Sequence, residues 1–381
     1  MKIDEVQTFQ VGIIGGGLAG LSLAIQCADK GFSTILFEKE TFPFHKVCGE
    51  YISMESYSFL DQLGFSFQNF QLPQIKKLAI SDSEGKTYFF DLPLGGFGVS
   101  RYLLDNNLYE IAKQKNVFIQ TATKVNEVNF ENDCFNIETN KGKYKTLIAA
   151  ATFGKRSNLD IKWKRSFTTE NKNALNNFIG IKYHVRFPQP AEQISLHNFK
   201  NGYCGISNIE NNRCCLCYLT TAKNLQLNNN SITEMEKNVL AKNPMLKKIF
   251  SEAEFLYKEP LAISQISFQK KTQTENHVLM IGDAASVITP LCGNGMSMAM
   301  HASKIAFQNI EQFLQQKITR MQMEQLYKKQ WQQAFSRRLQ AGRIVQTFFG
   351  NNTGTSIFLK TMHAMPFIAK QVIRSTHGKV F

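Results

Sequence analysis

The sequence has no apolar run long and clean enough to span a bilayer. Its most apolar stretch, Val278–Met300, is interrupted by a Gly-Asp pair and a proline, whereas a membrane-spanning helix needs about 20 consecutive apolar residues. The amino-terminal end lacks the basic and then apolar pattern of a secretion signal, because Asp4 and Glu5 stand there. We therefore expect a cytoplasmic protein, with a peripheral position on the inner face of a membrane as an open alternative.

The sequence also lacks the cysteine spacing of a disulfide framework or a zinc site. Its eight cysteines, without a secretion signal, are more naturally reduced thiols than disulfides. The one close group, Cys214, Cys215 and Cys217, has no second spaced pair and no histidine nearby in the sequence. No metal is therefore expected, and the chain has no internal repeat.

Acidic residues are nearly absent from the carboxyl-terminal tail. Between Lys317 and Phe381, eleven Lys or Arg stand against the single acid Glu324, so the tail carries +10 of the net charge of +14. A solvated basic face is the simplest interpretation. Two hypotheses compete with it, docking on an anionic membrane surface or on an acidic carrier protein that brings a tethered substrate. No nucleic-acid-binding module is recognisable, so no nucleic acid partner is expected.

The same tail has apolar residues at helical spacing, which predicts amphipathic helices that cover a neighbouring sheet domain. The residues expected to face inward are Met323, Leu326, Trp331, Phe335, Leu339 and Ile344. The residues expected to lie mostly outward are Lys328, Lys329, Arg337, Arg338 and Arg343.

A glycine-rich segment lies near the start of the sequence. The apolar run Phe9–Ile14 predicts a buried strand, and Leu18–Lys30 predicts a helix. Glycines between them suit a dinucleotide, because they permit a tight turn, close approach of the backbone to phosphates, and close packing of helix on strand. The pyrophosphate then lies at the helix N-terminus. The predicted cofactor residues are Gly15, Gly17, Leu18, Ala19 and Gly20.

An acidic residue follows at the position where dinucleotide sites carry one. The strand Ser33–Phe37 delivers Glu38, followed by Lys39, where a carboxylate accepts from the adenosine ribose hydroxyl. A ribose 2′-phosphate would be repelled there. A lone glycine fingerprint is a weak signal, but strand, glycines, helix, strand and acid in register are much more specific.

A second glycine-rich segment, far along the chain, favours a flavin over a nicotinamide dinucleotide. The strand His277–Ile281 leads to Asp283, which would accept hydrogen bonds from a ribityl chain. The turn Pro290–Gly295 would bring amides and the dipole of the helix Met296–Phe307 to the flavin N1–O2 edge, which is anionic when reduced. The predicted FAD contacts are Gly282, Asp283, Pro290, Gly293, Asn294, Gly295 and Met296.

These two segments resemble those of the flavoprotein superfamily that holds aromatic-ring monooxygenases, flavin-dependent halogenases and geranylgeranyl reductases. The resemblance implies an α/β fold, with a Rossmann-type (glutathione-reductase-like) FAD domain, an inserted antiparallel β-sheet substrate domain and C-terminal helices. Hairpin signals at Asp82–Gly85 and Glu210–Asn212 support the inserted sheet. We assign 1–74, 98–155 and 274–316 to the FAD domain, 75–97 and 156–273 to the substrate domain, and 317–381 to the C-terminal helices.

Further segments resemble the superfamily between these two. Arg101 falls where the superfamily places an arginine near the FAD pyrophosphate. The segment Phe42–Ser53 resembles the Lys-x-Cys-Gly-Gly motif of the reductases, which implies a place beside the flavin. There Gly49 would let the chain pass close to the ring, and Lys46, Cys48 and Glu50 are candidates for contacts with flavin or substrate. A thiol at Cys48 could donate a proton to an alkene, or be a small buried hydrophobe.

Elsewhere the sequence departs from the superfamily. Thr152–Phe153 stands where an Ala-Asp pair is usual, and Asp160 where monooxygenases often carry arginine, which weakens the case for a nicotinamide-dependent hydroxylase. Within Asn201–Leu219 only a Gly-Tyr pair remains of the tryptophan-containing motifs, so halogenation is the least supported chemistry. Tyr203 is a candidate for lining the substrate cavity, or it packs a sheet.

The leading hypothesis is an FAD-dependent monooxygenase-type enzyme that acts through reduced flavin and O2 on an unsaturated or aromatic apolar substrate. The alternative is geranylgeranyl-reductase-like reduction of an isoprenoid or polyene double bond. A second alternative is a non-catalytic FAD-binding partner protein. Because only one dinucleotide fingerprint is present, NAD(P)H or another electron donor would bind transiently. The catalytic candidates are Cys48, Glu50 and Tyr203.

Overall fold

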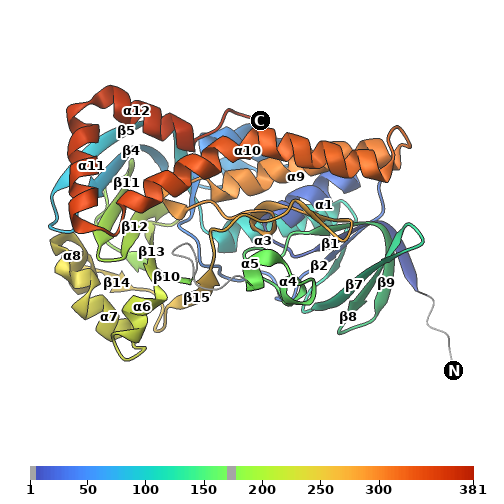
Figure 1. The fold of residues 1–381 in the computed structure, drawn as a ribbon, viewed down its shortest axis with the longest axis horizontal. Coiled ribbons are helices and arrows are strands. Elements are labelled where there is room, and N and C mark those ends of the chain that lie inside the picture. Colours follow the sequence, from blue (N-terminus) through green and yellow to red (C-terminus); the bar gives the residue numbers. More distant parts are fainter. Residues whose placement is uncertain (1–5, 170–176) are drawn as a thin grey trace.

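The computed structural model describes residues 6–169 and 177–381, and two β-sheets organise it (Figure 1). The first sheet has a parallel core in the order β17-β9-β1-β2-β6. Short β16 (Thr274–Glu275) borders β17, and the hairpin of β7 (Val125–Glu131) and β8 (Cys134–Thr139) joins β9. The core strands are β1 Gln7–Ile14, β2 Thr34–Phe37, β6 Phe118–Gln120, β9 Lys143–Ala151 and β17 Val278–Met280.

Three helices pack together with this sheet, α1 (Leu18–Asp29), α3 (Arg101–Gln114) and α9 (Gly295–Leu314). α1 contacts both of the others and is buried along most of its length, which explains why its sequence is apolar on nearly every side. The strands β1 and β2 end in fully buried residues, as expected for a parallel sheet covered on both faces. The predicted Rossmann-type domain is confirmed.

The second sheet is mostly antiparallel, in the order β14-β10-β13-β12-β11-β4-β5-β3, with β15 beside β10. One side packs on the short helices α6 (Ala222–Gln226), α7 (Ile232–Asn238) and α8 (Pro244–Glu252). Both predicted hairpins are present, as β4–β5 and β12–β13. The strands are β3 Tyr51–Ser53, β4 Gln74–Ser81, β5 Thr87–Gly98, β10 Phe178–Arg186, β11 Gln193–Phe199, β12 Gly202–Ile209, β13 Arg213–Thr221, β14 Glu254–Phe255 and β15 Leu261–Ile266.

Two short segments near the predicted domain boundaries pack with the other sheet than the one predicted. β3 lies within the range assigned to the FAD domain but pairs with β5 of the second sheet. Conversely, Leu159 of α4 (Asn158–Lys162) packs in the core of the first sheet, although it follows the predicted boundary at 155. Both segments are connections between domains, so their hydrophobicity does not reveal which core they join. The boundaries themselves stay a prediction. Short α2 (Tyr57–Gln62) and α5 (Ser166–Thr169) complete these connections.

The C-terminal tail forms α10 (Arg320–Phe348), α11 (Asn352–Ala364) and α12 (Pro366–Thr376). The prediction that they cover the sheet domain is wrong for α10, which runs along α9 (Figure 1). Its apolar stripe, including Trp331 and Phe335, joins the core of the first sheet. α11 and α12 do reach the second sheet, where Leu359 of α11 packs among side chains of β4, β11 and β12, and Ile373 of α12 packs with Ile75 and Leu92 of β4 and β5.

Two residues of α10 do not lie on the predicted face. Ile344, expected inward, is 54% exposed. Arg338, expected outward, is buried, with its Nη1 3.4 Å from Oε1 of the buried Glu55. The buried face of α10 changes along its length, because the helix is long and passes from the core of the first sheet to the edge of the core of the second. In the described part of the chain, no helix combines the length and the apolar character needed to cross a bilayer.

Candidate functional site

The glycine segment between β1 and α1 forms a tight loop with an open helix N-terminus. Gly15 has φ +111°, and a Cβ on Gly20 would lie 2.0 Å from the Gly15 carbonyl oxygen. Neither position therefore accepts a side chain. Gly17 is the N-cap of α1, with no side-chain cap among the described residues and no acid in the first turn. These free amides and the helix dipole favour an anion.

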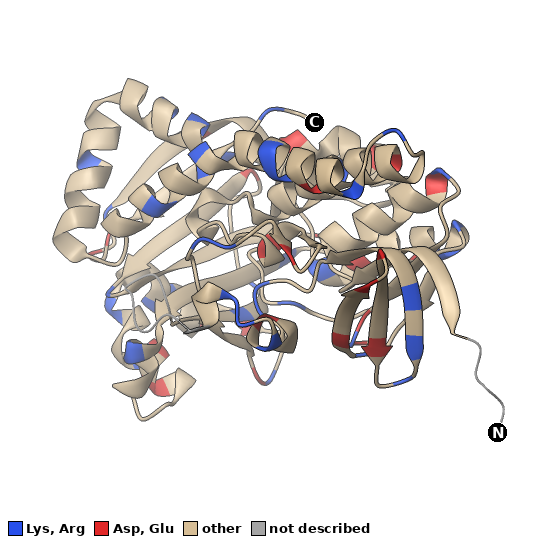
Figure 2. Ribbon diagram, turned by 45° about the vertical axis from the view of Figure 1, so that its right-hand side comes forward, with Lys and Arg blue, Asp and Glu red and all other residues tan. Residues whose placement is uncertain are grey.

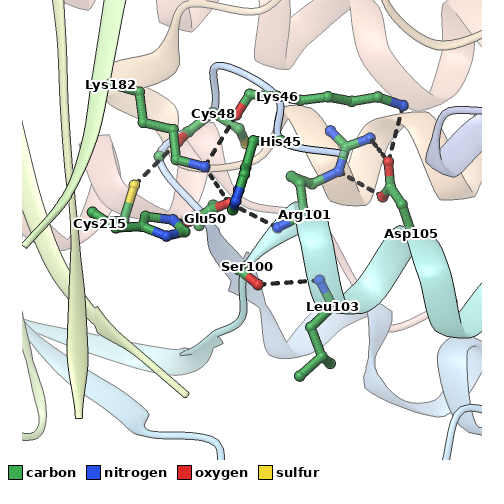
Figure 3. Close-up of polar contacts among 12 residues, drawn as sticks. His45, Lys46, Cys48, Glu50, Ser100, Arg101, Leu103, Asp105, Lys182 and Cys215 are labelled. Atoms are coloured by element: carbon green, nitrogen blue, oxygen red, sulfur yellow. Dashed lines mark hydrogen bonds and ion pairs between the residues drawn. The ribbon is translucent and has the colours of Figure 1, made fainter. Parts of the chain in front are cut away.

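Two cations lie over this helix N-terminus. Lys46 Nζ and Arg101 Nη2 are each 3.8 Å from the position that a Cβ on Gly17 would take. Asp105, one turn along α3, holds both, with a bidentate Arg101 pair at 2.7 Å and Lys46 Nζ at 3.0 Å (Figure 3). Burial alone would raise the pKa of Asp105, but the two cations outweigh it and lower that pKa. The loop therefore faces a fixed positive charge.

Glu38 lies at the end of β2, beside the same loop. Its Oε2 accepts from the Gly16 amide at 2.8 Å, and its Oε1 accepts from the Glu40 amide at 3.0 Å. The carboxylate is therefore buried at the edge where a ribose is predicted. Lys39 differs, because its side chain is 70% exposed and pairs with Glu40. Its predicted cofactor contact stays a prediction.

The second glycine segment packs against the first. A Cβ on Gly282 would lie 3.2 Å from Ala19 of α1, and Asp283 occupies the short turn that follows β17. The turn Pro290–Cys292 ends at Gly293, whose φ is +64°, and α9 begins at Gly295. Beside it, Asn294 donates to the Thr376 carbonyl, while its Oδ1 is buried without a partner among the described residues.

The loop with Cys48 and Gly49 joins these segments to the second sheet. Cys48 Sγ lies 3.6 Å from Met296 Sδ at the start of α9. Cys215 Sγ of β13 donates to the Cys48 carbonyl at 3.2 Å. Gly49 is exposed, and a Cβ on it would find no atom within 4 Å. The loop therefore borders open space between the two domains.

Glu50 is the buried centre of the site. Its backbone has φ +56°, which is rare for a residue with a side chain, and its side chain is fully buried. Oε1 accepts from the Arg101 amide at 2.8 Å and from Lys182 Nζ at 2.5 Å, and Oε2 bonds His184 Nε2 at 2.6 Å. Burial raises the pKa of Glu50, but Lys182 and His184 outweigh it and bring that pKa to about 2. Glu50 therefore ties the loop to α3 and to β10.

Sequence reasoning missed Lys182 and His184. The pattern that could have revealed them is a pair of charged or polar residues at alternate positions of the otherwise apolar run Phe178–Val185. Alternate positions place both side chains on one face of a buried strand. Buried charges need partners, so the pattern predicts an acid opposite them. It does not say which acid, because Glu50 lies far away in the sequence.

The polar network continues from Glu50 toward the surface. His184 Nδ1 bonds the Tyr257 hydroxyl at 2.6 Å, and that hydroxyl lies 3.1 Å from Nε2 of His45. His45 stacks on the exposed ring of Tyr102. Burial and then the Lys182 charge lower the pKa of His45 to about 4. The chain of titratable groups is therefore uncharged at its outer end at neutral pH.

One trio in this network could hold a metal ion. Ligand atoms of Glu50, His184 and Cys215 all lie within 4.8 Å of one another. A histidine is thus close to the cysteine group in space, which the sequence spacing concealed. The Lys182 ammonium already neutralises the same carboxylate, so the arrangement is that of a buried ion pair. All eight cysteines are free thiols.

Comparison with known proteins bears on what this arrangement holds. A family model described as FAD binding domain matches residues 8–320 of the chain. The chain belongs to the FAD binding domain family. A curated relative, conditioned medium factor receptor 1 of Dictyostelium discoideum, is 22% identical over 375 residues, which are 91% of this chain and 72% of the relative.

Solved flavoproteins share the fold. The flavin-dependent brominase Bmp2 has TM-score 0.77 at 18% identity, over 98% of this chain and 94% of its own. PqsL of Pseudomonas aeruginosa, described as a probable FAD-dependent monooxygenase, has TM-score 0.72 at 13% identity, over 92% and 99%. A geranylgeranyl bacteriochlorophyll reductase-like protein of Thermoplasma acidophilum has TM-score 0.75 at 16% identity, over 99% and 93%. The resemblance to this superfamily is confirmed in family and fold, and the chain is an FAD-binding protein by family.

The residues present fit FAD. The open helix N-terminus with Lys46 and Arg101 above it suits a pyrophosphate. The open space at Gly49 leaves room for a large group. Glu38 at the adenosine end and Asp283 at the ribityl end remain the predicted sugar contacts.

Tyr203 is not brought to the other catalytic candidates. It is buried in β12, its ring lies edge to face with Phe349 at 6.2 Å, and its hydroxyl has no partner among the described residues. Further along the same strand, Ser207 Oγ lies 3.4 Å from the Gly49 carbonyl oxygen. Tyr203 therefore lies along the sheet from the Cys48 loop, and its role stays a prediction.

Proposed function

We propose that this protein is a monooxygenase-type flavoenzyme that uses reduced FAD and O2 to oxidise an unsaturated or aromatic apolar substrate. The observation that carries the proposal is the meeting of the Cys48 loop, the start of α9 and β13 at one place, through the Cys48–Met296 and Cys215–Cys48 contacts. The predicted flavin ring therefore borders the second sheet. PqsL, which has this fold, is described as a probable monooxygenase.

The side chains of the second sheet here support an apolar substrate. Burial raises the pKa of Cys217 to about 12 and that of Cys215 well above its usual value. Such thiols stay neutral, and a site that excludes water protects a reactive oxidant from unproductive decay. Bound FAD would supply the electron transfer to O2. The protein would supply positioning, with the α9 N-terminus stabilising negative charge at the flavin edge.

Rapid mixing of the anaerobically reduced protein with O2, with and without aromatic or polyene compounds, tests this proposal. A transient absorbing species distinct from oxidised and reduced flavin, with oxygen from O2 in the product, is expected. Direct return to the oxidised spectrum without labelled product would refute it. The reductive step is run with NAD(P)H and with other electron donors, because the identity of the donor is part of the proposal.

Reduction of an isoprenoid or polyene double bond is the second candidate. Cys48 favours it, because its thiol lies at the predicted flavin and the reductase-like Thermoplasma protein shares the fold. One alkene carbon would accept a hydride from reduced flavin, the other would take the Cys48 Sγ proton, and the thiolate would regain a proton from solvent. Cys48→Ser should then abolish turnover with flavin reduction intact, while Cys134→Ser, on β8, should change neither.

A non-catalytic role is the third candidate, and the receptor name of the Dictyostelium relative favours it. It predicts a protein that retains FAD but whose flavin no physiological donor reduces. Photochemical reduction under the same conditions is the control, because it shows whether the flavin itself is competent. Rapid reduction by NAD(P)H would exclude this candidate.

A further inference from the structure

The last two helices carry basic residues and no acid. No Asp or Glu follows Glu324 in the sequence, and Figure 2 shows the resulting blue segments on α11 and α12. On α12, Lys370 and Arg374 are exposed, while Ala369 and Ile373 on the opposite face are buried. The charged residues on the exposed face of α12 are therefore all basic.

Large apolar side chains are exposed at the start of α12 and on α11. Phe367 is 79% exposed, the highest value among large apolar residues of the described chain. Met365, in the link between α11 and α12, is 52% exposed, and Ile357 of α11 is 59% exposed. A single exposed apolar residue needs no explanation. Phe367 and Met365 at the junction of the two helices, with Ile357 and the exposed Lys360 of α11, make up the surface that we call the α11–α12 corner.

Helical spacing aligns the two kinds of residue. Phe367, Lys370 and Arg374 recur at intervals of three and four, so they share one face of α12. A surface of this kind can lie against a membrane, with the aromatic ring among the acyl chains and the basic groups at the phosphates. Anionic lipid headgroups attract such groups within a Debye length of the surface.

We propose that the α11–α12 corner docks the protein on an anionic lipid surface. Phe367 and Met365 would enter the interfacial layer, and Lys360, Lys370 and Arg374 would bind headgroup phosphates. Charge complementarity is the first argument for lipid. The second argument is the exposed phenyl ring of Phe367, which can insert among acyl chains but would find no apolar layer to enter on an acidic protein surface.

A cavity beneath α12 is consistent with a lipid source of substrate. It measures about 300 Å³ and is lined by Leu92–Gly95 of β5 and by Ile373, Arg374, His377 and Gly378. Arg374 thus belongs both to the docking face and to the cavity wall. The same helix accepts the Asn294 hydrogen bond at Thr376, 2.6 Å away, next to the predicted flavin turn. Docking itself does not depend on which reaction the flavin performs.

Co-sedimentation of the FAD-loaded full chain with vesicles tests the proposal. Binding to phosphatidylcholine vesicles containing phosphatidylglycerol, lost at high salt, is expected, with little binding to pure phosphatidylcholine. Each basic residue is expected to contribute roughly fivefold to partitioning. Lys370→Glu with Arg374→Glu should therefore weaken binding at least tenfold, and Phe367→Ser should weaken it severalfold.

Matched variants elsewhere on the surface are the controls. Lys237→Glu with Lys247→Glu makes the same charge change on α7 and α8, and Leu227→Ser removes another exposed apolar side chain. Both should bind vesicles as the unchanged protein does, and flavin absorbance confirms that all variants fold. Equal loss in the control charge variant, or no loss in the α12 variants, would overturn the proposal. So would binding to acidic protein or RNA without binding to vesicles.

Discussion

At the scale of single residues, Glu50 is a buried contact between the two domains. Glu50→Gln would leave the Lys182 ammonium buried without a counter-charge, and we expect a loss of about 3–5 kcal/mol in the free energy of unfolding. Urea denaturation measures it. Glu254→Gln breaks the exposed pair with Arg186 and should cost less than about 1 kcal/mol. Equal losses in the two variants would mean that Glu50 is not a buried partner of Lys182.

Buried histidines predict how stability depends on pH. Burial lowers the pKa of His197 from 6.5 to about 4, so the unfolded chain binds a proton before the folded one does. The contribution of neutral His197 to the free energy of unfolding is complete above pH 6.5 and is lost as the pH falls toward 4. Between pH 7 and pH 5 this one residue should remove about 2 kcal/mol of stability.

His197→Asn should reduce that pH dependence by the same amount, measured by urea denaturation at both pH values. His363→Asn, on an exposed position of α11, is the matched control for the substitution itself. An unchanged slope in His197→Asn would show that His197 is not held neutral by burial.

Gly49 offers a direct test of the cofactor site. Its Cβ position is free of protein atoms within 4 Å, so Gly49→Ala should leave stability within about 0.5 kcal/mol while lowering retained FAD several-fold. Flavin absorbance per protein measures it. Gly354→Ala on α11 is the control and should leave FAD retention unchanged. Full FAD retention in Gly49→Ala would place the flavin ring elsewhere.

At the scale of elements, α10 belongs to the first domain rather than to the second sheet. Arg338→Met would leave the Glu55 carboxyl buried without its ion pair and should cost about 3 kcal/mol. Arg337→Met, next along the helix but exposed, should cost less than about 0.5 kcal/mol. Urea denaturation of the two variants distinguishes the observed face from the predicted one.

The helices and strands also show which features of the fold could be predicted from the sequence. The strand, loop and helix of the first glycine segment could be predicted because their signals are local, within Phe9–Lys30. The pairing of Lys182 and His184 with Glu50 could not, because it depends on how β10 meets a distant loop. The face of α10 was missed for the same reason. An apolar stripe predicts that a helix is buried, not against which sheet.

At the scale of the whole molecule, FAD should stabilise both domains together, because the open space at Gly49 lies between them. Saturation at about 100 times the dissociation constant adds about 2.7 kcal/mol. FMN lacks the adenosine part that Glu38 would hold, and it should add much less at equal concentration. Urea denaturation with each flavin measures this, and equal effects would contradict the role of Glu38.

The first sheet is assembled from three distant parts of the chain, since β1 pairs with β9, and β9 with β17. During synthesis, at about 5–20 residues per second, β17 leaves the ribosome tens of seconds after β1. β9 emerges about halfway through that interval, and from then until β17 follows, its free edge can pair with other strands. The nascent chain therefore needs either chaperone protection or a fast closing step once β17 and α9 emerge.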